Sequence, residues 1–401
     1  MKQAITRRRI LRSAAAAGTF TILGPHLVRG AAANSKIELG VVGCGGRGAW
    51  IAGLFARNPG YHVSAVADYF QAVADRAGDA LGVARDRRFS GLLGYRRLLD
   101  AKVDAVALET PPWFFPRHVV DSVNAGVHVY MAKPVACDVL GTLQVLEAGR
   151  KARANKKCFL VDFQMRTDPH NIEVVRRIHE GALERVCAIN SFYNDEGFAD
   201  PAKTPTIESR LQQLIWVNDN DLGGGYFVNA GIHAIDTALW IANRPPLSAV
   251  GQAARTRRDP HGDSDDVFAI TYDFGDGLIC SHRGEHVHNL NGFSCGCTVM
   301  GRGAFAETNY AGKAWLRGGK QAYKGGDVEN LYEAGAVRNI AAFHKAVTEG
   351  DYSNPTLEPS INSNLAVILG RDACRKGRKI TWDELLADKS RLDVDLSGLR
   401  E

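Results

Sequence analysis

Short apolar runs alternate with amphipathic segments through the first part of the chain. Five apolar runs have the length of buried strands: 37–42, 62–67, 104–109, 127–131 and 158–163. Helical periodicity is found between them, near 49–55, 71–80, 115–124 and 138–154. Strands that alternate with helices form a mostly parallel sheet, so the pattern predicts an α/β domain over residues 34–160.

Past Gln164 the pattern changes. After a helix expected from Asn171 to Glu180, β-rich runs recur with glycine turns between them: 185–192, 248–255, 267–274, 277–283 and 295–300. This spacing predicts a second α/β domain at 161–401 with a large, open, mostly antiparallel sheet. Two helices, near 335–349 and 361–376, are expected to close the chain. An open sheet face favours a homodimer or homotetramer.

A glycine-rich loop follows the first predicted strand directly. Gly43, Gly45 and Gly48 have the GxGxxG spacing, and helical periodicity resumes at Ala49. The first glycine permits a tight turn, the second lets the backbone approach a pyrophosphate, and the third lets helix and strand pack closely. The loop therefore indicates a Rossmann dinucleotide-binding domain. The alternative is a plain glycine turn in a phosphate-free α/β fold.

The second predicted strand ends at Asp68, twenty residues beyond Gly48. A carboxylate there can accept hydrogen bonds from ribose hydroxyls and repels a 2′-phosphate, which favours NAD over NADP. Arg47, inside the loop, could pair with a 2′-phosphate, so NADP remains the alternative cofactor. The expected cofactor contacts are Gly43, Gly45, Gly46, Arg47, Gly48 and Asp68, with Thr110, Pro111 and Lys133 at the ends of other strands.

The first 33 residues differ from the rest in composition. Thr6-Arg7-Arg8-Arg9-Ile10-Leu11-Arg12 is followed by the apolar run 13–23 and by Ala31-Ala32-Ala33. This order is typical of a twin-arginine signal peptide, and the run is too short to span a bilayer. It predicts a periplasmic or otherwise exported protein that folds around its nucleotide first. Since NAD is scarce outside the cytosol, we expect it to be bound tightly.

Composition and charge give no support for a protein that binds nucleic acid or an anionic membrane surface. The 401 residues are 45% hydrophobic, enough for two domains, and the net charge is +5. Six positive charges precede residue 34, and without them the charge is −1, so nothing indicates nucleic acid or an anionic membrane surface. None of the eight cysteines shows zinc-ligand spacing, and we expect buried free thiols rather than disulfides.

Hydride transfer from a secondary alcohol needs a general base and a cation or donor at the developing oxyanion. Lys133 stands at the carboxyl end of a predicted strand, before Pro134, where it can reach a cofactor crevice. His233 follows a glycine-rich segment, with Asn229 four residues before it and Asp236 three after it. On a helix these three share a face, so His233 is a candidate base with an orienting partner.

His282, His286 and His288 form a further cluster, with Glu285 beside them. Alternation along a strand puts the three histidines on one face, which leaves zinc open. A polar sheet face is the preferred interpretation, because no carboxylate or thiol completes a compact site. The sequence therefore predicts no metal centre.

The motifs together resemble the glucose-fructose oxidoreductase / inositol dehydrogenase / MocA (Gfo/Idh/MocA) family. The resemblance runs from about Ile37 to Leu386 and rests on the glycine loop, Thr110-Pro111, Ala132-Lys133-Pro134, Gly223-Gly224-Gly225, Gly231-Ile232-His233-Ala234-Ile235-Asp236, Gly301-Arg302-Gly303-Ala304 and Ile380-Thr381-Trp382-Asp383-Glu384-Leu385-Leu386. It implies NAD(P)-dependent redox chemistry on sugars, polyols or glycosides and an open sheet that mediates oligomers. It also implies that Lys133 and His233 fill the places of the family's catalytic lysine and acid/base histidine.

Three positions depart from the family pattern. Ala132 replaces the usual glutamate, Asn229 replaces an aspartate that assists the histidine, and Phe115 stands where many exported members carry histidine. Without a carboxylate at 229, His233 should be a weaker base. Further expected contacts are Gln164 to cofactor, and Arg166, Tyr226 and Asp236 to substrate. Trp113, Trp216 and Tyr226 could stack on a sugar ring or pack in the core.

The sequence therefore predicts an exported NAD(P)-dependent oxidoreductase that acts on a secondary hydroxyl of a sugar, polyol or glycoside. Lys133 would polarise the reacting oxygen, while His233 and Asn229 serve proton transfer. The alternatives are an NAD-dependent glycoside hydrolase that works by transient oxidation and elimination, and a sugar-binding relative that has lost its chemistry.

Overall fold

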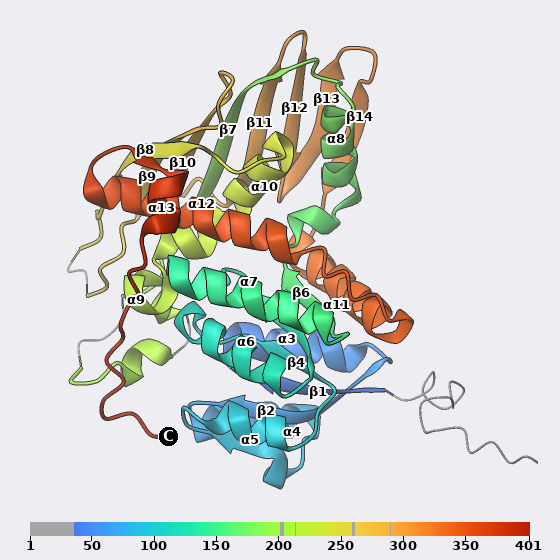
Figure 1. Ribbon diagram of the computed structural model, residues 1–401, viewed down its shortest axis with the longest axis vertical. Helices are drawn as coiled ribbons and strands as arrows, with labels where there is room; N and C mark the ends of the chain where they lie inside the picture. Colours follow the sequence, from blue (N-terminus) through green and yellow to red (C-terminus); the bar gives the residue numbers. More distant parts are fainter. Residues whose placement is uncertain (1–35, 201–203, 213, 259–260, 289) are drawn as a thin grey trace, which may run out of the picture. The chain divides into compact units, whose positions relative to one another are not determined.

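The computed structural model describes residues 36–200, 204–212, 214–258, 261–288 and 290–401. The leader expected at 1–33 lies outside these residues. Ile37–Glu401 forms one compact unit, and the boundary expected at residue 160 stays a prediction. Within this unit the two sheets expected from the sequence are both present (Figure 1).

Six parallel strands form the first sheet, in the order β3-β2-β1-β4-β5-β6. The strands are β1 Ile37–Val42, β2 Tyr61–Asp68, β3 Arg88–Ser90, β4 Ala105–Leu108, β5 His128–Ala132 and β6 Phe159–Asp162. Their connecting helices are α3 Gly46–Arg57, α4 Gln71–Leu81, α5 Gly94–Asp100, α6 Phe115–Asn124 and α7 Val139–Ala154. This strand order is that of the dinucleotide-binding Rossmann fold, so the prediction for the first domain is confirmed.

Nine strands form the second sheet, in the order β14-β13-β12-β11-β7-β10-β9-β8-β15. They are β7 Val186–Asp195, β8 Ser248–Ala254, β9 Val267–Asp273, β10 Ile279–His286, β11 Ser294–Gly301, β12 Ala304–Asn309, β13 Gly312–Gly318, β14 Tyr323–Val328 and β15 Ile380–Thr381. The β7–β10 pair is parallel and the other pairs are antiparallel. The predicted mostly antiparallel sheet is thus confirmed.

Helices of the second domain cover one face of this sheet. Its helices are α8 Pro169–His179, α9 Asn220–Gly223, α10 Ile232–Ala242, α11 Leu331–Glu349, α12 Leu357–Lys376 and α13 Trp382–Ala387. Figure 1 shows α8, α10 and α12 against the sheet, and they contact strands from β14 to β8. Residues along β10 alternate between exposed and buried, as expected for a sheet with one covered face.

Four strands, β12 to β15, and two helices, α9 and α13, of this domain are absent from the sequence-based prediction. Gly312 and Gly318 stand at the two ends of β13, and Gly325 lies within β14, which weakens the β pattern of this part of the chain. Successive pairing of β11 with β12, β12 with β13 and β13 with β14 makes these segments strands. Helices α11 and α12 begin four residues earlier than expected, and β15 and α13 follow them. The prediction that two helices close the chain is therefore wrong.

Helix α12 of the second domain forms hydrogen bonds with the segment that follows β5 of the first domain. Oδ1 of Asn364 accepts a hydrogen bond from the backbone N–H of Val135 at 3.1 Å, and Nη1 of Arg371 donates to the carbonyl of Cys137 at 2.8 Å. Both contacts fix the segment that follows the cis Lys133–Pro134 peptide bond. The backbone that carries Lys133 is therefore held between the domains.

All eight cysteines are free thiols. Six are buried, as expected, but Cys187 is exposed and Cys374 is partly exposed. Cys187 points outward because its neighbours in β7 alternate between the faces of the sheet. Among the described helices, none combines the length and hydropathy that a bilayer crossing requires.

Candidate functional site

The glycine loop has the geometry that its sequence predicts. Gly43 has φ of 88°, and a Cβ on it would lie 2.8 Å from the carbonyl oxygen of Glu109. A Cβ on Gly48 would lie 1.8 Å from the carbonyl oxygen of Gly43, so only glycine lets helix α3 pack this closely. Positions 45 and 46 face open space, where a phosphate group could approach the backbone.

Asp68 lies at one end of the cleft above this loop. Its carboxylate accepts hydrogen bonds from the backbone N–H of Cys44 at 2.8 Å and of Phe70 at 2.9 Å. Burial raises the pKa of this carboxyl above its ordinary value. Around it is a cavity with aromatic and apolar walls, here called the adenosine-side cavity, whose lining includes Gly43, Gly45, Tyr69, Phe70, Gly91, Leu92, Thr110, Pro111, Phe114, Leu211 and Trp216.

Arg47 turns away from the adenosine-side cavity. Its Nη2 is 2.5 Å from Oδ2 of Asp162, its Nε is 3.1 Å from Oε2 of Glu109, and its guanidinium lies 5.5 Å from the ring of Tyr332. Burial raises the pKa of Glu109 to about 7, against the opposing effect of Arg47. Because these partners occupy the guanidinium, it does not meet a ribose 2′-position beside Asp68. The geometry therefore favours NAD over NADP.

We expect Asp68→Asn to reduce the preference for NAD over NADP by about tenfold or more. The amide keeps the size of the side chain but removes the negative charge that would repel a 2′-phosphate, and charged hydrogen bonds contribute about 1.5–3 kcal/mol. Titration of the protein with NADH and with NADPH measures the ratio of dissociation constants. Asp100→Asn, an exposed change at the end of α5, is the control and should leave the ratio unchanged. An unchanged ratio in Asp68→Asn would contradict this role.

A second cavity of about 430 Å³ continues along the loop, here called the reaction cavity. It shares Gly45, Glu109, Thr110 and Trp216 with the adenosine-side cavity. Residues from both domains line it, among them the predicted site residues Gly45, Gly46, Arg47, Gly48, Thr110, Lys133, Gln164, Asn229 and His233. The structure therefore brings together the residues expected to bind cofactor and those expected to carry out chemistry.

Lys133 enters the reaction cavity from the end of β5. Its Nζ donates a hydrogen bond to the backbone carbonyl of Asn229 at 2.7 Å, which leaves further N–H donors of the amine for a ligand. Burial, and next the positive charge of Arg47, lower the pKa of Lys133 to about 7. Asn229 thus supports Lys133 through its main chain, from a π-helical turn at Phe227–Gly231 that precedes α10.

His233 enters the same cavity from the first turn of α10. Its ring stacks on Tyr193, with centroids 6.2 Å apart, and meets Tyr310 edge-on at 5.3 Å. Burial, and then the charges of Lys133 and Arg47, lower the pKa of His233 well below its ordinary value. The imidazole is therefore neutral at pH 7, the form that a general base needs, and the same burial makes it a weaker base, as the sequence analysis expected. Nδ1 is buried and has no hydrogen-bond partner within the described part of the chain.

Asp236 and Arg166 were expected to contact substrate, and the structure places them outside both cavities. Nε of Arg166 donates to Oδ2 of Asp236 at 2.8 Å, and Ser363 donates to Oδ1 at 2.7 Å. Asp236 is fully buried in this pairing, so it does not orient His233 either. Asp236 lies three residues beyond His233 on α10, and it faces Arg166 and α12 instead of the cavity. Both expectations for Asp236 are corrected.

The expectation that Tyr226 contacts substrate is also corrected. It is 2% exposed, stacks on His286 with centroids 3.3 Å apart, and does not line either cavity. Its backbone N–H donates to Oγ of Ser264 at 2.9 Å, which fixes it behind the cavity wall. Of the other candidate aromatics, Trp216 lines both cavities, whereas the indole of Trp113 donates to the carbonyl of Leu392 at 2.7 Å.

Several residues of the reaction cavity were missed by the sequence analysis. They are Glu109, Tyr193, Asp195, Phe198, Phe293, Tyr310 and Tyr332. Tyr193 and Asp195 are two apart at the carboxyl end of β7, so alternation along a strand would have placed them on one face. Nothing in the sequence relates this face to Lys133. The carboxylate of Asp195 and the phenols of Tyr193 and Tyr310 line the same cavity as Lys133 and can form hydrogen bonds with a polyhydroxylated ligand.

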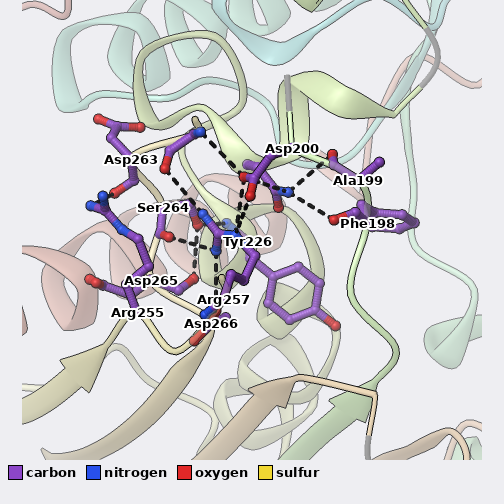
Figure 2. A network of polar contacts seen from close by, with 12 residues as sticks. Phe198, Ala199, Asp200, Tyr226, Arg255, Arg257, Asp263, Ser264, Asp265 and Asp266 are labelled. Carbon is purple, nitrogen blue, oxygen red and sulfur yellow. Dashed lines mark hydrogen bonds and ion pairs between the residues drawn. The ribbon is translucent and has the colours of Figure 1, made fainter. Parts of the chain in front are cut away.

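A polar network surrounds Arg257 and reaches Phe198, which lines the reaction cavity (Figure 2). Nε of Arg257 is 3.1 Å from both carboxylate oxygens of Asp200, and its Nη1 is 3.3 Å from Oδ2 of Asp266. Nδ2 of Asn218 donates to the carbonyl of Phe198 at 3.1 Å. Because Phe198 lines the cavity, the contact from Asn218 holds the backbone that carries this aromatic residue.

The histidine cluster does not form a metal site among the described residues. His282 and His286 lie on the covered face of β10 at 2% and 1% exposure, and His288 pairs with Glu196 at the surface. Burial lowers the pKa of His282 and of His286 to about 3. No group of three or more histidine, cysteine or acidic residues in the described chain could hold a metal ion. The expected polar sheet face is instead a buried, aromatic-packed one.

The residues present fit a dinucleotide. Gly45 and Gly46 leave open backbone where a pyrophosphate could bind, and Asp68 lies at the adenosine end. At the other end, Oε1 of Gln164 is buried and has no hydrogen-bond partner within the described residues, although the side chain lines the reaction cavity. A buried acceptor of this kind is typical of a site that a ligand completes.

Two family models match the chain. Residues 37–163 match an oxidoreductase family with an NAD-binding Rossmann fold, and residues 171–304 match the Gfo/Idh/MocA C-terminal domain. Inositol 2-dehydrogenase 2 of Saccharopolyspora erythraea is 26% identical over 245 residues, which are 61% of this chain and 65% of that protein. The chain thus spans just under two thirds of that relative's length.

Solved structures share the fold at low sequence identity. Aldose-aldose oxidoreductase from Caulobacter crescentus, in complex with glycerol, has a TM-score of 0.69 and 20% identity, covering 86% of this chain and 100% of that one. Levoglucosan dehydrogenase in complex with NADH has a TM-score of 0.70 and 17% identity, covering 86% of this chain and 99% of that one.

Proposed function

Because the chain belongs to the Gfo/Idh/MocA family of NAD-binding oxidoreductases, we propose that it is an NAD-dependent dehydrogenase acting on a secondary hydroxyl of a sugar or polyol. The observation that carries this proposal is the convergence of Lys133 and His233 on one cavity above the glycine loop. The two side chains come from different domains, so their meeting is a property of the fold as a whole.

The chemistry divides between these two residues. Lys133 donates a hydrogen bond to the reacting hydroxyl oxygen and stabilises the negative charge that develops on it. The neutral imidazole of His233 accepts the hydroxyl proton as the carbonyl forms. Gly45, Gly46 and Gln164 would hold NAD, and the bound cofactor would supply the acceptor for the hydride of the carbinol carbon. Tyr193, Phe293 and Tyr310 form walls that exclude water, and Asp195 can accept hydrogen bonds from further hydroxyls.

The proposed roles predict a pH dependence. The productive enzyme has a charged Lys133 and a neutral His233, and the pKa of Lys133 is lowered to about 7 while that of His233 is lowered well below its ordinary value. As pH rises above 7 the ammonium is lost, so kcat/KM for oxidation should fall about tenfold per pH unit. Lys133→Arg, which stays charged, should remove this fall. A pH profile in which the arginine variant keeps the same alkaline decline would contradict the assignment.

The function itself is tested by a nucleotide analysis and a substrate screen. Mass spectrometry of nucleotide released from the purified protein should detect NAD. Adding myo-inositol, other polyols and aldoses should then produce reduced nicotinamide, measured by absorbance. Cleavage of aryl glycosides with no net reduction would support the glycoside hydrolase alternative instead. Absence of reduction and cleavage across the screen would contradict the proposal.

Export remains part of the proposal. The twin-arginine motif at Thr6–Arg12 and the apolar run after it lie outside the described residues, and their sequence is the support for a periplasmic location. Fractionation of cells that express the full chain tests it. Replacing Arg7, Arg8 and Arg9 with lysine should retain the protein in the cytosol.

A homo-oligomer formed through the nine-stranded sheet is also proposed. Val250 and Ile279 lie on this sheet and are 45% and 48% exposed, which favours contact with a second copy. Light scattering after size exclusion should give a dimer or tetramer. A monomer at micromolar concentration would contradict this part.

A further inference from the structure

The chain returns to the nucleotide-binding domain after its final helix. Figure 1 shows the red segment that leaves α13 and runs past α9 toward the first sheet. Residues 390–401 are here called the C-terminal strap. The family models match residues up to 304, so they assign no role to this segment.

The end of the strap contacts the rim of the adenosine-side cavity. The backbone N–H of Leu92 donates to the carbonyl of Arg400 at 3.0 Å. The N–H of Arg400 donates to the hydroxyl of Tyr69 at 3.2 Å, and Nη2 of Arg400 donates to the Tyr69 carbonyl at 2.9 Å. Tyr69, Gly91 and Leu92 all line the cavity. Gly91 has φ of 87°, and a Cβ on it would lie 2.3 Å from the main-chain oxygen of Glu401.

The strap also meets the second domain at this rim. The hydroxyl of Tyr69 donates to Oε1 of Glu208 at 3.1 Å, and Leu211, three residues later, lines the same cavity. A Cβ on Gly398 would lie 3.0 Å from Cγ2 of Thr206, so the strap packs against the segment that carries Glu208. The strap therefore connects the loops after β2 and β3 with a segment of the other domain.

A second attachment fixes the start of the strap. The backbone N–H of Leu392 donates to Oδ2 of Asp138 at 3.0 Å, and its carbonyl accepts from the indole of Trp113 at 2.7 Å. Asp138 also caps the N-terminus of α7, where its Oδ1 accepts from Gly141 at 2.6 Å. Trp113 precedes Phe114, another residue of the cavity wall. The strap is thus held at both ends by elements of the cofactor domain.

We propose that the C-terminal strap completes the adenosine end of the cofactor site and slows release of the dinucleotide. This rests on the proposed function, in which the cleft holds NAD. A purine bound among Tyr69, Phe70, Leu92 and Leu211 would contact residues that the strap connects. To leave, the nucleotide must separate these loops, which breaks the hydrogen bonds to Arg400. Slow release suits an exported enzyme that recycles its cofactor in place.

The release rate of NADH tests this inference. The protein is loaded with NADH and mixed with excess NAD, and the loss of NADH fluorescence gives the dissociation rate. Removing residues 397–401 should accelerate release about tenfold, because three hydrogen bonds at the rim are lost. Trp113→Phe, which removes the donor to Leu392 but lies outside both cavities, should accelerate it severalfold. Arg378→Ala, which removes an exposed pair with Glu384, is the control and should release NADH at the unaltered rate.

Unaltered release from both strap variants, with thermal melting like that of the full chain, would overturn the inference. If the shortened chain does not fold, the Trp113→Phe rate decides alone. Failure of the unaltered protein to bind NADH would instead overturn the proposed function. A fast rate in the strap variants with normal NADH binding supports both.

Discussion

Replacing Lys133 with alanine is expected to lower kcat about a thousandfold while leaving the dissociation constant of NADH within about threefold. The ammonium is the one cation of the described residues that enters the reaction cavity without a carboxylate partner, since Arg47 is paired with Glu109 and Asp162. Its loss removes the donor that stabilises charge on the reacting oxygen, an interaction stronger in the transition state than in the substrate complex. Steady-state kinetics and an NADH titration measure the two quantities.

Lys151→Ala is the matched control for this prediction. Lys151 is exposed on α7 and bonds to the side chain of Asn124, so its removal should leave kcat and NADH binding unchanged. Circular dichroism should give the same folded spectrum for both variants. If Lys133→Ala binds NADH normally and keeps kcat within tenfold of the unaltered enzyme, Lys133 does not act on the reacting oxygen.

His233→Ala should lower kcat on the order of a hundredfold, and added imidazole should restore part of the rate. The ring is buried among Tyr193 and Tyr310, so its removal leaves a space that free imidazole can enter. Rescue by imidazole identifies a proton-transfer role, because a residue that only packs would not be replaced by a free base. The rescue should follow the neutral fraction of the added imidazole.

The matched control is His62→Ala, an exposed change on β2, where the imidazole pairs with Glu38. It should not change kcat, and imidazole should not affect it. A large loss in His233→Ala that imidazole does not restore at any concentration, together with lower thermal stability, would indicate a structural role for His233.

Local sequence predicted the parts of this site that depend on short spacing. The glycine loop, Asp68 and Lys133 all stand at strand ends. A Cβ on Gly48 would meet the nearby Gly43 carbonyl, and one on Gly43 would meet Glu109 after β4, the neighbour of β1 in the sheet. The nearness of Asn229 and His233 also came from helical spacing, although the π-helical turn between them was not expected.

The rest of the site depends on contacts between residues that are far apart in the sequence. Arg166 and Asp236 are seventy residues apart in sequence and take each other as partners, so neither is available to a ligand. Tyr193 and Tyr310 meet beside His233 because β7 pairs with β11 and β11 with β12, an arrangement that no local pattern specifies. Arg400 of the strap and Tyr69, which contact each other, are 331 residues apart in the sequence. Such contacts depend on the assembled fold and not on propensity.

The most direct test of the central claim is a crystal structure of the protein with NAD and a polyol that it oxidises. One hydroxyl oxygen of the polyol should lie within about 3 Å of both Nζ of Lys133 and a ring nitrogen of His233. The carbon that bears this hydroxyl should face the nicotinamide. A complex in which the two side chains bind different groups, or in which the polyol lies away from the nicotinamide, would contradict it.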